Sequence, residues 1–171
     1  MSRTKAFTGI PVTAPPKNVF DLSHDRKYST RFGKLTPVFI MDVVPGDKVS
    51  IKSNLLLRFA PLVYPVMHEA NAYIHFFYVP NRILWPNWEN FITGGESGND
   101  ASVWPYLEST LHDKSYGTLF DYMGLPVADD VGSTNTYQYS ALPFAAFQKI
   151  YNDYYRDENL ISEIDPTLVD G

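Results

Sequence analysis

The sequence of 171 residues contains no cysteine. This absence excludes a disulfide framework, a cysteine-ligated zinc or iron–sulfur site, and catalysis by a thiol. Long apolar runs are also missing, since the longest, residues 72–79, is interrupted by His75 and is far too short to cross a bilayer. The first residues lack the continuous apolar core of a signal peptide. We therefore expect no membrane contact, and synthesis and folding in a reducing cytoplasm.

A net positive charge is missing as well. The 14 Lys and Arg residues face 19 Asp and Glu residues, a formal charge of −5, which argues against a nucleic-acid binder that is basic all over. The charge is uneven, because residues 1–35 carry a net +5 and residues 36–171 therefore carry −10. The basic side chains of the first segment are Arg3, Lys5, Lys17, Arg26, Lys27, Arg31 and Lys34. We interpret residues 1–35 as a basic N-terminal arm and residues 36–171 as the body.

Three segments before residue 80 have the pattern of β-strands. Residues 48–59 alternate, with five of six positions apolar on one face and one of six on the other, which predicts a strand with one wet side. Residues 36–43 and 72–79 are apolar on both faces and predict covered strands. Pro45 and Gly46 predict a turn between the first two strands, and the alternation does not decide whether it closes a hairpin or forms a corner between two sheets.

The rest of the chain has helical patterns separated by loops. Helices are predicted over residues 85–93, with Pro86 in the first turn, over 118–123, and over 141–157, with Ser140 as the N-cap. Residues 94–116 and 127–137 are interpreted as loops. Three strands leave two open sheet edges and too little material to cover residues 72–79. We infer that further polypeptide completes the domain: more sequence, a partner or copies of itself.

No set of residues in the sequence carries catalytic chemistry. Thr93–Gly98 is rich in glycine but lacks the Lys and Ser/Thr of a phosphate loop. The four histidines have no metal-ligand spacing, and the adjacent Asp129 and Asp130 lie in a polar loop. We predict no enzyme, no catalytic residue, no metal and no cofactor.

Two groups of side chains could serve binding. The cations of residues 26–34 are interleaved with Tyr28 and Phe32, a composition suited to single-stranded nucleic acid, although a solvated segment is equally compatible. The aromatic residues of the two longer predicted helices either fill a core or form a subunit interface, where Trp and Tyr are enriched.

Five long segments make the sequence resemble a known family, the major capsid proteins of the Microviridae, and most closely the gokushovirus branch of these single-stranded DNA bacteriophages. The segments are NVFDLSHDRK (18–27), VVPGD (43–47), the run 58–95 from RFAPLVYP to NFITGG, LFDYMGLP (119–126) and SALPFAAFQKIYNDYYRDENL (140–160). The family's proteins are much longer, so this chain resembles their N-terminal part.

The resemblance implies a mainly β fold with helical insertions, a viral jelly-roll β-sandwich of which this chain holds the incomplete N-terminal part. It places a helical insertion at about residues 81–160. It implies a structural major capsid protein that self-assembles into an icosahedral (T=1, sixty-copy) shell around single-stranded DNA. The implied partners are copies of the chain, the remainder of the same capsid protein, packaged DNA and other phage structural proteins. The implied location is the virion, assembled in the host bacterial cytoplasm.

Two sets of residues are the candidate sites. For packing or subunit contact they are Trp85, Trp88, Phe91, Tyr151 and Tyr154. For contact with DNA phosphate they are Arg3, Lys5, Lys17, Arg26 and Lys27. Two alternatives remain: a β-sandwich carbohydrate-binding module with exposed aromatic residues, and a hydrolase using His112, Asp129 and Asp130.

Overall fold

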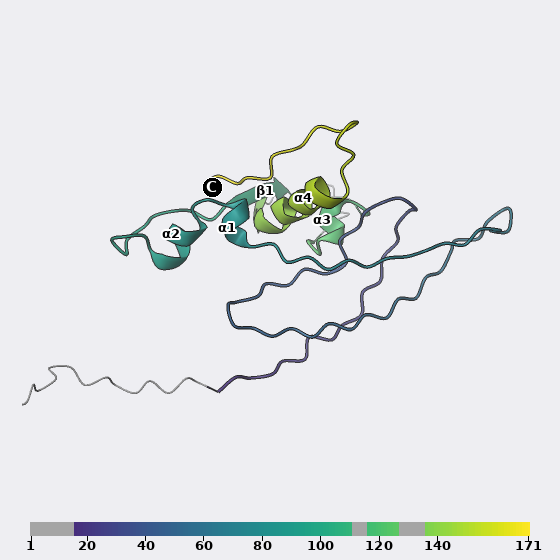
Figure 1. The fold of residues 1–171 in the computed structure, drawn as a ribbon, viewed down its shortest axis with the longest axis horizontal. Coiled ribbons are helices and arrows are strands. Elements are labelled where there is room, and N and C mark those ends of the chain that lie inside the picture. Colours follow the sequence, from purple (N-terminus) through teal and green to yellow (C-terminus); the bar gives the residue numbers. More distant parts are fainter. Residues whose placement is uncertain (1–15, 111–115, 127–135) are drawn as a thin grey trace, which may run out of the picture.

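The computed structural model describes residues 16–110, 116–126 and 136–171. Its elements are α1 (Asn81–Leu84), α2 (Trp88–Thr93), β1 (Tyr106–Thr110), α3 (Leu119–Tyr122), β2 (Thr136–Ser140) and α4 (Leu142–Tyr154). Figure 1 shows α1, α3, α4 and β1 gathered together, while the chain before α1 runs through long extended loops away from them. The structure thus has a small helical body and an extended N-terminal half.

Helix α4 confirms the longest predicted helix, but its start and its buried face differ from the prediction. The N-cap is Ala141 rather than Ser140, and a proline stands in the first turn, where its missing N–H costs nothing. The fully buried residues of this region are Ala141, Ala145 and Asn152. Small side chains therefore face the body, and the large aromatic residues lie along the flanks of α4.

A two-stranded antiparallel sheet replaces parts of the two predicted loops. Strands β1 and β2 pair with Leu107 opposite Tyr139 and Glu108 opposite Gln138. The side-chain amide of Gln138 donates to Glu108 Oε1 at 2.8 Å. Both strands are only five residues long, and they pair across about 30 residues. Strand β1 has no apolar alternation, whereas Tyr137 and Tyr139 alternate with polar residues in β2, a short local signal that the loop interpretation missed.

The helix predicted over residues 85–93 begins later, as α2 at Trp88, and the short helix α1 before it was not predicted. Trp85 is extended, with φ −135° and ψ 112°, and separates α1 from α2. A residue before proline is driven out of the helical region by the proline ring, so Pro86 fixes this break. Helix α3 confirms the helix predicted over 118–123, and Gly124 follows it with φ 86°.

The three predicted strands are not formed in the described chain. Residues 36–43, 48–59 and 72–79 are extended but belong to no backbone ladder among the described residues. The turn between the first two is present, with Asp47 N–H donating to Val44 O at 3.1 Å and Gly46 at φ 94°. A strand needs a paired neighbour, and the hydrogen-bonding edges of these segments lack one here. The jelly roll implied by the resemblance is therefore not seen in this chain.

Candidate assembly surface

Trp85 is a core residue of the helical body. Its side chain is 1% exposed, and its ring centroid lies 5.2 Å from that of Phe91 and 6.3 Å from that of Trp88. The indole Nε1–H donates to Asp170 Oδ1 at 2.9 Å. Trp85 is thus buried within the chain, while Trp88 is half-buried and Phe91 is 40% exposed.

The last residues of the chain hold the corner between α1 and α2. Asn87 Nδ2 donates to both carboxylate oxygens of Asp170, at 3.1 and 2.9 Å. The backbone N–H of Leu168 donates to Leu84 O at 2.7 Å. These contacts were not predicted, because a polar tail of eleven residues has no periodic pattern that indicates what it packs against.

Asn152 connects the same tail to α4. Its buried side-chain amide donates to Ile164 O at 2.6 Å, and its Oδ1 accepts from Gln148 Nε2 at 2.8 Å. A buried polar group is tolerated where its hydrogen bonds are satisfied, which is the case here. The sequence alone gives no sign of this role, since an Asn in a helix is normally exposed.

One face of residues 72–79 lies against the end of α4. His75 Nδ1 is hydrogen-bonded to the hydroxyl of Tyr155, and the two rings are stacked with centroids 6.0 Å apart. The ring of Phe77 lies 4.8 Å from that of Tyr154. The bland interpretation of His75, a hydrogen-bonded packing residue, matches this contact.

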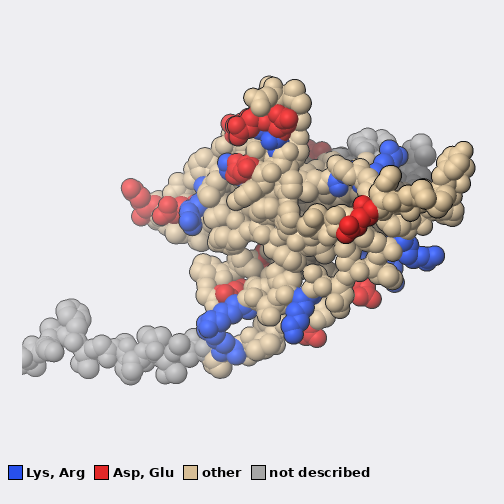
Figure 2. All heavy atoms as spheres, turned by 45° about the vertical axis from the view of Figure 1, so that its right-hand side comes forward, with Lys and Arg blue, Asp and Glu red and all other residues tan. Residues whose placement is uncertain are grey.

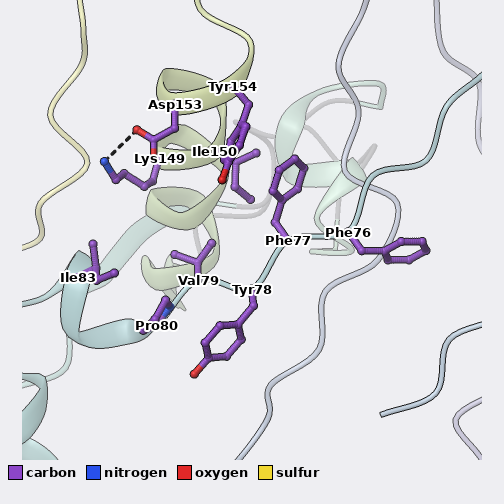
Figure 3. Close-up of a pocket in the computed structure, with 10 residues that line it drawn as sticks. All are labelled: Phe76, Phe77, Tyr78, Val79, Pro80, Ile83, Lys149, Ile150, Asp153 and Tyr154. Carbon is purple, nitrogen blue, oxygen red and sulfur yellow. Dashed lines mark hydrogen bonds and ion pairs between the residues drawn. The ribbon is translucent and has the colours of Figure 1, made fainter.

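A groove runs between this segment and α4. Its volume is about 280 Å³, and Figure 3 shows Phe77 directed toward Tyr154 while Phe76 points away. The rim carries the Lys149–Asp153 ion pair at 2.9 Å, and the hydrogen bond that Lys149 donates to this carboxylate raises the pKa of Lys149. Tyr154 is 68% exposed. Tyr151 is half-buried. The exposed part of Tyr154 is available to a second polypeptide.

The larger apolar surface belongs to residues 48–59. Its apolar face, which we call the 49–59 face, is about half exposed at each position. Its members are Val49, Ile51, Leu55, Leu57 and Phe59. Among the described residues, Phe32 is the side chain that stacks on it, with its ring 5.7 Å from Phe59. In the described part of the chain only five apolar residues are buried, so this face is left without a core to join.

The five cations predicted to bind phosphate differ in whether the structure describes them and in whether their side chains already have a hydrogen-bond partner. Arg3 and Lys5 lie outside the described residues. Lys17 Nζ donates to Gly46 O at 3.3 Å, and Arg26 donates to three backbone carbonyls. Lys27 is exposed. Figure 2 shows several Lys and Arg side chains near the start of the described chain, with Asp and Glu side chains close to them and further Lys and Arg side chains elsewhere on the same face.

The chemistry of an enzyme finds no support in the described ranges. No group of three or more potential metal ligands occurs among residues 16–110, 116–126 and 136–171. His112, Asp129 and Asp130, the residues of the hydrolase alternative, lie outside those ranges. A search of the same ranges finds no helix with the length and apolar character that a membrane span requires.

Comparison with known proteins identifies the family. The model of a phage capsid family, described as capsid protein (F protein), matches residues 9–170. The chain belongs to this family. It is 38% identical over 162 residues to capsid protein VP1 of Chlamydia phage 1, 34% identical over 170 residues to that of Bdellovibrio phage phiMH2K, and 27% identical over 157 residues to that of Spiroplasma virus 4.

The matches cover nearly all of this chain but only part of each relative. They take in 90%, 97% and 90% of this chain, but 26%, 31% and 27% of the three relatives. The chain thus spans about a quarter to a third of the length of the F-family relatives it matches. The resemblance to Microviridae capsid proteins is confirmed, and its relatives are structural proteins rather than enzymes.

Proposed function

We propose that this chain forms the N-terminal part of a major capsid protein that self-assembles into an icosahedral, sixty-copy T=1 shell enclosing single-stranded DNA. The observation that carries the proposal is the exposed 49–59 face, together with the three segments 36–43, 48–59 and 72–79, which belong to no backbone ladder among the described residues. Membership of the F family supports it. In a capsid protein such surfaces are buried by the rest of the same polypeptide and, at the subunit contacts, by repetition of the subunit.

The energy available from this burial is large compared with the stability of a domain. Each large apolar side chain contributes about 1.5–3 kcal/mol when fully buried. The five side chains of the 49–59 face are already about half covered, so their remaining burial contributes about 4–8 kcal/mol. A domain is commonly stable by only about 5–15 kcal/mol, so the chain alone lacks a decisive part of its stability.

The partner that covers the face is the remainder of the same capsid protein, folded with this chain into a jelly roll. The relatives are three to four times longer than the matched region, which leaves ample sequence for further strands. Residues 36–43, 48–59 and 72–79 supply the first strands and gain their ladders from it. Copies of the subunit and other phage structural proteins then cover the groove and Tyr154.

The basic arm is proposed to face the interior and contact packaged DNA. Its net charge of +5 contrasts with −10 in the rest of the chain. Substituting Arg3, Lys5, Lys17, Arg26 and Lys27 together by Gln should leave empty shells intact but weaken DNA retention. The deficit relative to the unsubstituted protein should be largest at low salt and should shrink as the salt concentration rises. Unchanged retention at several salt concentrations would contradict the role.

Electron microscopy and sedimentation of the purified virion-derived protein test the proposal. A closed particle with icosahedral symmetry and density continuing beyond Gly171 is the expected result. A carbohydrate-binding module predicts instead a small monomer with saturable sugar binding. The particle is expected to assemble in the host bacterial cytoplasm, and recovery of shells from lysed cells before phage release would check this.

A further inference from the structure

Residues 26–38 wrap around helix α3, and we call this segment the clasp. Tyr122, at the end of α3, is 6% exposed and lies at its centre. The Tyr122 hydroxyl donates to Ser29 O at 2.6 Å, and the ring meets Tyr28 edge-on, with centroids 6.0 Å apart. The clasp is closed on itself by Thr30 and Thr36, whose hydroxyl oxygens lie 2.9 Å apart.

Two of the clasp's four cations are used to hold α3. Arg26 is half-buried, and its Nη1 donates to Val38 O at 3.0 Å. Its Nη2 donates to Asp121 O at 3.4 Å and also to Tyr122 O, which are carbonyls at the C-terminal end of the helix. Asp121 O also accepts from the backbone N–H of Gly124 at 3.0 Å. Carbonyls at the end of a helix carry partial negative charge, so a guanidinium suits them.

Lys34 holds the opposite side of the same helix. Its Nζ donates to Gly117 O at 3.0 Å and lies 4.6 Å from the centroid of the Tyr122 ring, close enough for a cation–π interaction. Lys27 and Arg31, by contrast, are exposed, and neither side chain has a hydrogen bond or ion pair in the described part of the chain.

We propose that the clasp divides its cations between two tasks. Arg26 and Lys34 are positioning residues that fix the clasp to α3, whereas Lys27 and Arg31 provide the charge that the clasp offers to a polyanion. The second task rests on the proposed contact with single-stranded DNA; the first does not. Arg26 thereby leaves the set of phosphate contacts that its sequence position suggested.

The test compares neighbouring substitutions in the assembled protein with two separate measurements. Amide hydrogen exchange of the peptide over 26–38 reports whether the clasp is fixed. The salt dependence of binding to a single-stranded oligonucleotide reports phosphate contacts, because each contact contributes about 0.7 to the slope of log K against log salt. Exchange is measured in particles and binding on dissociated subunits of the same preparation.

Arg26→Gln and Arg26→Lys should both speed exchange of the clasp several-fold and leave the slope unchanged. Lysine keeps the positive charge but lacks the planar guanidinium whose nitrogens reach the three carbonyls. It should therefore not restore slow exchange if Arg26 positions the clasp. Tyr122→Phe, which removes the bond to Ser29, should speed exchange in the same way. Lys27→Gln and Arg31→Gln, the matched controls, should leave exchange unchanged and each reduce the slope by about 0.7.

Two results would overturn the proposal. One is a slope that falls in Arg26→Gln and is restored in Arg26→Lys, since that pattern assigns Arg26 to phosphate. The other is unchanged exchange in Arg26→Gln and Tyr122→Phe. A wild-type protein whose binding shows no salt dependence would instead remove the DNA contact of the clasp, while the exchange data still decide whether Arg26 positions it.

Discussion

Trp85 and Tyr154 show how far the environments of two aromatic residues differ in one small body. Trp85 is 1% exposed and hydrogen-bonded to Asp170, whereas Tyr154 keeps most of its surface open beside the groove. Removing the first therefore leaves a cavity and takes away one of the two donors to Asp170 Oδ1, while removing the second leaves the body intact.

Trp85→Ala should lower the stability of the helical body by about 3–5 kcal/mol, the usual cost of emptying a buried aromatic site. Tyr154→Ala should change it by less than about 1 kcal/mol but reduce the yield of particles, because its exposed ring is placed for contact between polypeptides. Thermal denaturation of dissociated subunits and sedimentation of assembled material measure the two effects. Equal losses of subunit stability in both variants would contradict the distinction.

The hydrogen bonds of Asn152 allow a second prediction for a single residue. Asn152→Ala removes the donor to Ile164 O and the acceptor of Gln148, and should cost about 1–3 kcal/mol because both partners lose a bond in a half-buried place. The neighbouring Asp153→Ala removes only the exposed pair with Lys149, which is worth about 0.2–1 kcal/mol. Hydrogen exchange near residue 164 should rise in the first variant and stay unchanged in the second.

At the scale of elements, the sequence predicted what local chemistry decides. Helices α3 and α4 have an apolar period and a stop signal, and both were found within a few residues of their predicted bounds. The break at Trp85 could have been predicted from Pro86, because the restriction on the preceding residue is local. The pairing of β1 with β2 and the clasp around α3 could not, since both join segments 30 or more residues apart through mostly polar groups.

The end of α2 offers a matched pair of glycines. Gly94 and Gly98 have φ of 80° and 69°, so alanine at either position is strained by about 1–2 kcal/mol. A side chain at Gly94 would also meet the Gly98 backbone at 3.2 Å, while one at Gly98 meets nothing within 4 Å. Gly94→Ala should therefore lower the thermal midpoint of the particles more than Gly98→Ala. Equal midpoints would show that the close approach has no energetic consequence.

At the scale of the whole molecule, the helical body is held by contacts within the chain, whereas the extended half requires contacts with further polypeptide. The body fixes its corner, tail and clasp through its own hydrogen bonds, whereas residues 36–79 present apolar faces and belong to no backbone ladder in the described chain. The aromatic contacts of His75 and Phe77 join this half to α4 along a single segment. Assembly should therefore depend on the extended half far more than the fold of the body does.

Ile51→Lys places a charge on the 49–59 face and should abolish particles while the helical body keeps its fold. Burying an unpaired charge is far more costly than the apolar contact it replaces. Ser50→Lys is the matched control, because Ser50 is next to Ile51 in the sequence but belongs to the polar face with Lys48 and Lys52. Sedimentation should show particles for Ser50→Lys and slow material for Ile51→Lys. Particles of normal yield in Ile51→Lys would contradict burial of this face.

The long stretch of bare backbone in residues 36–79 also bears on how the polypeptide can be produced. Exposed strand edges of this kind pair with one another and aggregate when assembly with their native partners is slow. When synthesis of the chain is faster than capsid assembly, the unassembled chains should accumulate as inclusion bodies. Slow, cool expression should then recover more usable material than strong induction.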